Sequence, residues 1–221
     1  MRITLSALFV CLFLLSCSGT TNQFILEDYN IDRQDVSISL MPVESDFHFE
    51  DYPEHVFGAL RPQEQRVFNQ DLANILANRT SATVTGILPS SAQVNNEFEL
   101  REFTLSESSF RAVTPKQGQP FNASSGQAQF ILILDQYFFT PYTVEVGGDS
   151  YAGHESKTEE RLRFETNYVI WDTDLRDAVA WGQVNATEQI NFGNTRATYI
   201  DILNKAIEKI VAVSPFNGVN V

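Results

Sequence analysis

Two histidines in an acidic stretch are the first candidates for chemistry. His48 and His55 lie in residues 46–55, among several carboxylates. Imidazole nitrogens and carboxylate oxygens are the ligands of many divalent-metal sites. The spacing matches no recognised ligand pattern, however, and Pro53 prevents a helix from aligning the two rings. We therefore interpret the stretch as a solvated acidic loop and predict no metal site.

Catalysis needs a nucleophile beside a base, or two carboxylates across a substrate bond. The sequence contains no Gly-x-Ser-x-Gly, His-Glu-x-x-His, phosphate-binding loop or dinucleotide fingerprint, and no nucleophile motif lies near His154. A cell-wall hydrolase with a carboxylate pair stays open as an alternative, because 28 acidic residues supply many chance pairs. We predict no catalytic residues, no enzyme activity and no cofactor.

The thiol of Cys17 has a clear chemical context. Arg2, an apolar run over residues 3–15 and the small Ser16 precede it, which is the order of a secretory signal peptide. The run is shorter than the ~20 apolar residues that span a bilayer. Cleavage before Cys17 removes residues 1–16 and Cys11 with them, so Cys17 is the one cysteine left and no disulfide is possible within the chain.

The motif Leu14-Leu15-Ser16-Cys17 resembles the lipobox of bacterial lipoproteins. In that family the cysteine becomes the first residue and its thiol is acylated, so the resemblance implies a palmitate-type anchor on Cys17. Ser18, rather than Asp, follows the cysteine. By resemblance to enterobacterial sorting, this implies an outer-membrane anchor with a periplasmic body. A plain signal peptide or a hydrophobic anchor is the alternative.

The charge balance argues against one class of partner. The chain has 15 basic and 28 acidic residues, and loss of Arg2 leaves 14 − 28 = −14. No cluster of Lys and Arg occurs, so we predict no nucleic-acid partner. Contact with anionic headgroups is expected to come from the lipid rather than from a basic face.

Hydrophobic periodicity predicts the elements of the first half. A strand is expected over residues 36–40, ended by Pro42, and a helix from Pro62 to Arg79. The helix buries one stripe, formed by Val67, Phe68, Leu72, Ile75 and Leu76. Strands follow over residues 82–88 and 97–105, the second with Phe98 and Leu100 on one face, and then a loop over residues 114–126.

The second half centres on the apolar run at residues 130–134, which predicts a strand covered on both faces and continuing to Pro141. A loop over residues 147–160 leads to a half-exposed strand over residues 162–170. A turn over residues 172–177 joins it to a partner strand over residues 179–190. Small side chains on that partner are expected to let a helix lie close: Ala180, Gly182, Val184 and Ala186. The closing helix has its cap at Asn194 or Thr195, is stopped by Pro215, and buries Tyr199, Leu203, Ile207, Ile210 and Val211.

This order, with hairpins rather than helical crossovers, predicts an α+β fold: a mostly antiparallel sheet with two helices packed on one face. We expect a signal peptide at residues 1–16, a lipidated cysteine and flexible tether at 17–35, and a single domain at 36–216.

One hairpin carries a second resemblance. Tyr168-Val169-Ile170-Trp171-Asp172-Thr173, followed by Ala178-Val179-Ala180-Trp181, resembles the hairpin of small periplasmic lipoprotein domains. Those domains belong to the activators of penicillin-binding proteins and the curli-secretion lipoproteins. Residues 173–177 replace the usual Thr-Gly turn, and the stretch after Leu40 lacks the family's polar pattern. The resemblance implies a non-enzymatic role in the envelope.

Aromatic residues indicate where a partner would bind. The chain has 17 Phe, and Phe47, Phe49 and Tyr52 are spaced by acids in the stretch from Glu44 to Phe57. Exposed together, such rings mark an interface. We therefore expect an accessory or envelope-assembly factor that binds another envelope protein. The alternatives are a lipoprotein that binds lipid or a small molecule and, less favoured, the cell-wall hydrolase.

Overall fold

The apolar run at residues 130–134 begins strand β6 (Phe130–Val146), which lies between β7 (Lys157–Asp172) and β2 (Ser37–Pro42). All five side chains of the run are buried, so the prediction of a strand covered on both faces is confirmed. The computed structural model describes residues 22–27, 29, 36–43, 62–80, 82–88, 96–122, 128–147 and 156–216.

The main sheet has the strand order β1-β8-β7-β6-β2-β3, where the remaining strands are β1 (Gln23–Ile25), β8 (Asp177–Gln189) and β3 (Thr83–Ile87). The pairings β1-β8, β8-β7 and β7-β6 are antiparallel, whereas β6-β2 and β2-β3 are parallel. The α+β class is confirmed, but the sheet is mixed. Parallel neighbours need a crossover, and α2 (Pro62–Arg79), the helix expected between these two strands, supplies it between β2 and β3.

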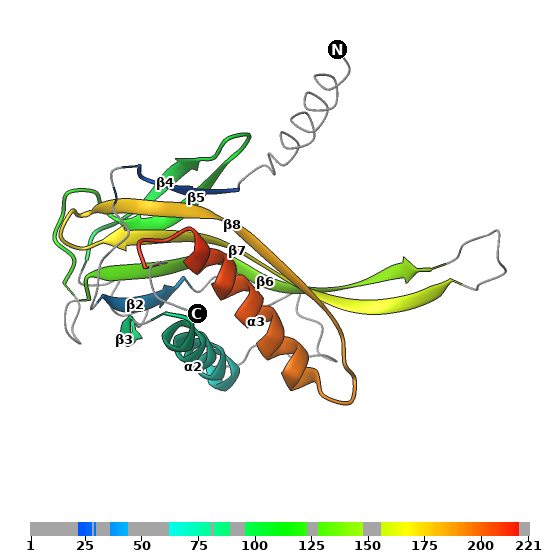
Figure 1. Cartoon of the computed structure of the whole chain (residues 1–221). Helices are drawn as coiled ribbons and strands as arrows, with labels where there is room; N and C mark the ends of the chain where they lie inside the picture. The colour runs from blue at the N-terminus through cyan, green and yellow to red at the C-terminus, as the bar shows by residue number, and fades with distance from the viewer. Residues whose placement is uncertain are drawn as a thin grey trace, which may run out of the picture.

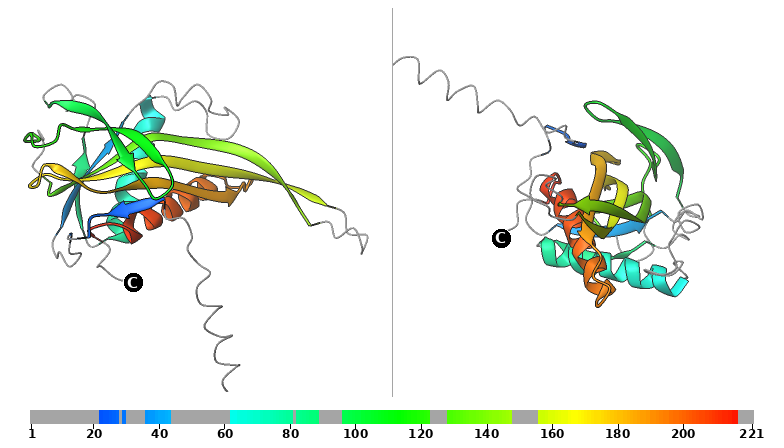
Figure 2. Two further views of the ribbon diagram at one scale, coloured as in Figure 1. Left: turned by 90° about the horizontal axis from the view of Figure 1, so that it is seen from above. Right: turned by 90° about the vertical axis from the view of Figure 1, so that its right-hand side faces the viewer.

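Helices α2 and α3 (Thr195–Ala212) lie on the same face of the sheet (Figures 1 and 2). The stripe of α3 is buried as predicted, and the Asn194 side chain caps the helix by accepting from the Ala197 N–H at 3.1 Å. In α2, Phe68 and Leu72 are 1% exposed but Val67 is 41% exposed, so Val67 was wrongly placed in the stripe. One helical step of 100° turns residue 67 away from its buried neighbour.

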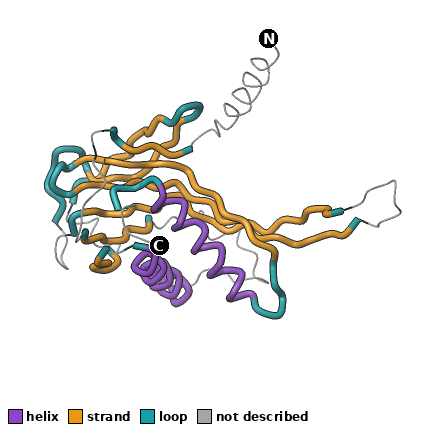
Figure 3. Tube along the Cα trace, in the orientation of Figure 1, coloured by secondary structure: helices purple, strands orange, loops and turns teal. Residues whose placement is uncertain are grey.

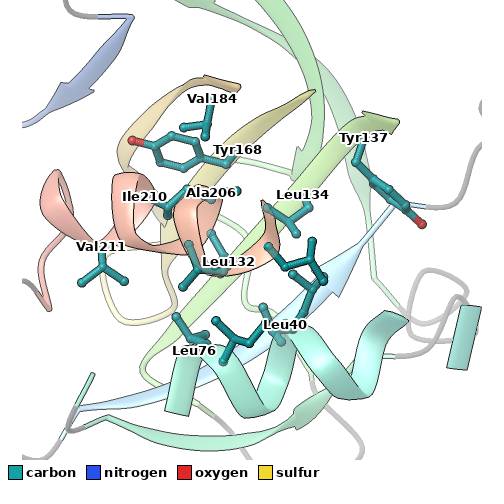
Figure 4. Close-up of a cluster of buried hydrophobic side chains, with 14 of the residues drawn as sticks. Leu40, Leu76, Leu132, Leu134, Tyr137, Tyr168, Val184, Ala206, Ile210 and Val211 are labelled. Carbon is teal, nitrogen blue, oxygen red and sulfur yellow. The ribbon is translucent and has the colours of Figure 1, made fainter. Parts of the chain in front are cut away.

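The core between helices and sheet is continuous. Figure 4 shows Leu132 of β6 on the side of the sheet where Leu76 of α2 and Ala206 of α3 also lie. Aromatic rings fill the space toward the far end of β6: Phe139 lies 4.7 Å from Phe164 and 5.5 Å from Tyr199, measured between ring centroids. Burial of large apolar side chains such as these supplies most of the stability of a fold.

The opposite face is partly covered by a separate two-stranded hairpin, β4 (Phe98–Thr104) with β5 (Ser109–Pro115). Its buried residues Phe103, Phe110 and Ala112 join a second core with Ile133 and Trp171. The sequence predicted β4 but not β5; on β4, Phe98 packs against this core while Leu100 is 52% exposed. The predicted loop at residues 114–126 also begins too early, since Thr114 and Pro115 belong to β5.

Part of the predicted tether belongs to the body. Strand β1 pairs with β8 in the register Gln23↔Gly182, and Tyr29 is 7% exposed. The prediction of a flexible tether across residues 17–35 was therefore wrong for these positions. The Gln23 amide donates to the Tyr168 hydroxyl at 3.0 Å and to the Lys209 carbonyl at 2.9 Å, so β1 is held from both the sheet and α3.

Strands β6 and β7 form a long hairpin that runs beyond the helices (Figures 1 and 3). The last pairing of β7 with β8 is Arg161↔Gln189. Beyond it, residues 143–146 pair with residues 157–160 with no third strand among the described residues; we call these eight residues the ribbon. The predicted loop at residues 147–160 therefore ends too late, because residues 157–160 belong to β7.

Candidate functional site

The part of the sheet that the β4-β5 hairpin leaves uncovered carries polar side chains. On β7, Glu165 and Asn167 alternate with Phe164 and Tyr168, which belong to the helix-side core. Alternate residues of a strand face opposite sides, so Glu165 and Asn167 face away from the helices. Here lies a hollow of about 260 Å³, lined by Asn22, Gln136, Phe138, Glu165, Thr166, Asn167, Gln183, Val184 and Asn185.

A β-bulge brings Gln136 to this hollow. The register of β6 against β7 shifts between Asp135 and Phe138, and Gln136 has a φ of 51°. That backbone region is unfavourable for a residue other than glycine and, where it persists, is held by its surroundings. Bulges re-aim side chains and are frequent beside functional sites.

Three amides join across three strands at the hollow. The Asn167 Nδ2 donates to the Gln136 Oε1 at 3.1 Å, and the Gln183 Nε2 donates to the Asn167 Oδ1 at 3.0 Å. We call Gln136, Asn167 and Gln183 the amide row. Asn167 is only 7% exposed, so its hydrogen bonds to neighbours on both sides fix its orientation. Each amide offers both donors and acceptors, which suits a peptide group or a hydroxyl.

Charged groups continue the polar face toward the ribbon. The Arg163 Nε lies 3.0 Å from the Glu165 carboxylate, and its guanidinium lies 5.8 Å from the centre of the Tyr142 ring. The Arg161 guanidinium contacts the Glu159 carboxylate at 3.1 Å, and this hydrogen bond raises the pKa of Arg161. Positive and negative groups alternate, so this face has no single-sign field.

The arrangement is suited to binding rather than to proton transfer. Amides do not titrate, and Glu165 is the one carboxylate that lines the hollow. In the described part of the chain, no group of three or more His, Cys, Asp or Glu side chains is placed to hold a metal ion. Neither α2 nor α3 has the length and apolar character that would let it cross a bilayer.

The buried carboxylates elsewhere have structural partners. Asp172, 0% exposed, accepts from the Tyr29 hydroxyl and from the backbone N–H groups of Asp174 and Leu175. Burial raises the pKa of Asp172, and the two backbone donors act in the opposite direction. Asp135 accepts from the Val113 N–H at 2.8 Å and so joins β5 to the main sheet.

The site residues predicted from the sequence are not those that line the hollow. Cys17, Phe47, Phe49, Tyr52 and all three histidines lie outside the described residues, so the anchor and the aromatic patch stay predictions. The amide row was missed. Glu165 and Asn167 lie on the predicted half-exposed strand over residues 162–170, but no local pattern indicates the bulge that adds Gln136.

Comparisons with known proteins give a distant likeness only. No protein-family model and no curated protein matches the chain. A similar solved structure is that of a neuraminyllactose-binding hemagglutinin homolog from Helicobacter pylori, at 12% identity and a TM-score of 0.35. The likeness covers 86% of this chain and 88% of that one. It is too distant to assign a fold family or a function.

Proposed function

We propose that the chain is an exported lipoprotein, acylated on Cys17 and held at the periplasmic side of the outer membrane, which binds another envelope protein as a non-enzymatic accessory or assembly factor. The leader and the Leu14-Leu15-Ser16-Cys17 motif support the anchor. The observation that carries the binding role is the amide row, on the same hairpin as the ribbon.

The ribbon favours a protein as the partner. An isolated two-stranded ribbon is only marginally stable in water, and residues 143–146 and 157–160 have no third strand among the described residues. A partner that packs on the ribbon would stabilise it. Nearer the body on the same hairpin, the amide row and Glu165 offer hydrogen bonds that a peptide backbone can complete.

The two alternatives have weaker support. A lipid ligand calls for an apolar cavity, whereas side-chain amides and Glu165 line this hollow. Hydrolysis of a glycosidic bond uses two carboxylates, and the lining provides Glu165 alone, with Arg163 beside it. A volume of about 260 Å³ suits one small polar group, such as a side chain or a backbone segment of a partner.

The anchor is tested by Cys17→Ser in the full chain. We expect the variant to lose labelling by a palmitate analogue and to leave the membrane fraction, because stable anchoring takes more than one acyl chain. Labelling of the Cys17→Ser protein would contradict the proposal.

The binding surface is tested by site-specific photo-crosslinking in intact cells. The photoreactive residue replaces Thr143 or Val146 of the ribbon, both exposed, or Glu208 of α3, whose side chain is 64% exposed, as the control. We expect a crosslinked species from the ribbon positions that is absent from the Glu208 position. Crosslinks from Glu208 alone would place the interface on the helix side and overturn the proposed surface.

The amide row is tested by Gln136→Gly, which removes one amide and relieves the unfavourable φ of 51°. We expect folding stability to be kept or raised while crosslinking from Val146 falls. The matched control is Arg176→Gly, which relieves a φ of 58° in the turn between β7 and β8. If both variants crosslink as the original chain does, the amide row does not contribute to binding.

A further inference from the structure

The edge strand β1 presents apolar side chains to solvent on one side. Phe24 is 39% exposed and Leu26 is 36% exposed. The Phe24 ring stacks on Trp181 with 4.5 Å between centroids, while its neighbours Gln23 and Ile25 face the helix side. Trp181 is itself half-buried and donates from its indole N–H to the Thr104 carbonyl at 2.9 Å. We call Phe24, Leu26 and Trp181 the edge patch.

The position of the edge patch on the body is fixed by the backbone. The Asn22 carbonyl accepts from the Gln183 N–H at 2.8 Å, and the Leu26 N–H donates to the Val179 carbonyl at 3.0 Å. Gly182 lets the two strands approach, since a Cβ there would lie 2.6 Å from the Asn22 oxygen. Residues 22–26 are therefore held on β8 by backbone hydrogen bonds.

Cys17 is only a short length of chain away from this patch. Six Cα-to-Cα steps separate Cys17 from Gln23, and at ~3.6 Å a step they reach at most ~22 Å. With acyl chains on Cys17 in the membrane, the edge strand stays within that distance of the bilayer surface. The patch is the exposed apolar surface that lies next in sequence to the anchor.

The chemistry of this stretch fits a lipid surface. Residues 18–26 carry no charge in a chain with 28 acidic residues, and the first acid after Cys17 is Glu27. Tryptophan is enriched where membranes meet water, because its ring is apolar and its N–H is polar. We propose that the edge patch lies in the headgroup region of the membrane that holds the lipid of Cys17. The inference rests on the acylation in the proposed function.

Tryptophan fluorescence tests this contact, because the chain has two tryptophans and Trp171 is 0% exposed. The full chain is expressed in a bacterium, purified from its membranes and reconstituted into phosphatidylcholine vesicles. Two brominated lipids are compared, one with bromine on the acyl chain near the headgroup and one with bromine deep in the bilayer. Bromine quenches tryptophan emission only at short range. We expect loss of emission with the shallow bromines, a smaller loss with the deep ones, and no loss in Trp181→Phe.

Variants of the patch sharpen the test. The double change Phe24→Ser with Leu26→Ser should abolish the quenching while the protein stays in the vesicle fraction. Phe192→Ser is the matched control: Phe192 is 65% exposed and follows the other end of β8, so quenching should persist. A chain that carries no lipid overturns the proposed function and the inference together. A lipidated chain with no quenching of Trp181 overturns the inference alone.

Discussion

Asp172 shows how one buried side chain holds distant parts of the chain together. One carboxylate oxygen accepts from the Asp174 and Leu175 N–H groups and forms the turn into β8, and the other accepts from the Tyr29 hydroxyl. Tyr29 also meets Phe130 edge-on, with 6.0 Å between ring centroids. The N-terminal segment is thereby fixed to the middle of the sheet.

The raised pKa of Asp172 predicts a pH dependence of stability. Above the ordinary Asp pKa of ~3.9 the unfolded chain releases this proton, while the folded chain keeps it to higher pH. The folded state then binds more protons, so the contribution of Asp172 to stability falls as pH rises from ~4 through the folded pKa. Asp172→Asn removes this proton and keeps the shape of the side chain.

Urea denaturation at a series of pH values measures this effect. The stability of the original chain minus that of Asp172→Asn should decrease as pH rises from ~4 toward neutral. The other acids titrate in both proteins and cancel in the difference. A difference in stability that is constant with pH, or that grows as pH rises, would show that burial does not raise the pKa of Asp172.

The elements themselves differ in how far the sequence predicts them. The stripes of α2 and α3 follow from 3.6-residue periodicity, with Val67 as the exception. Strand β1 has three residues, too few to show a period, and its place depends on residues of β8 far along the chain. Of the β4-β5 hairpin the sequence predicted β4 alone, and it missed β5, a strand of seven residues. The bulge at Gln136 depends on pairing between strands and leaves no local pattern.

At the edge strand, we predict that Gly182→Ala loosens β1. The new methyl group would meet the Asn22 oxygen at 2.6 Å and the Gln23 Cα at 2.9 Å, both of them backbone atoms that move only if the strand moves. Overpacking of this kind costs about 1–3 kcal/mol of unfolding free energy. Gly193→Ala is the control, since its Cβ would meet only the Asn191 side chain, at 3.3 Å.

Hydrogen exchange and denaturation measure the two variants. Gly182→Ala should lower the unfolding free energy and speed exchange of the Leu26 and Gln183 amides, which bond across β1 and β8. Gly193→Ala should change neither by much. Equal stability of the two variants would mean that β1 adapts without loss.

At the scale of the molecule, the described residues form two apolar cores, one on each face of the main sheet. Neighbouring residues of β6 contribute to different cores: Leu132 to the helix side, Ile133 to the hairpin side. Both are 0% exposed. Truncation of either to Ala should cost about 2–5 kcal/mol of unfolding free energy, as in other well-packed cores.

Chemical denaturation of the two variants tests whether both faces support the fold. Val67→Ala, at a position 41% exposed on α2, is the control and should change stability by about 0.5 kcal/mol or less. A loss below ~1 kcal/mol for Ile133→Ala alone would mean that the hairpin face contributes little to global stability.

The pairing of β1 with β8 also sets an order of events. Gln23 and Gly182 are 182 − 23 = 159 residues apart, so the edge of the sheet closes only when most of the chain has been made. A chain is synthesised from its N-terminus, and so Cys17 emerges long before β1 has a strand to pair with. In the proposed export route, the acylating enzymes meet this segment as extended chain. Strand β1 then pairs with β8 after acylation, so the domain completes its fold next to a cysteine that is already anchored in the membrane.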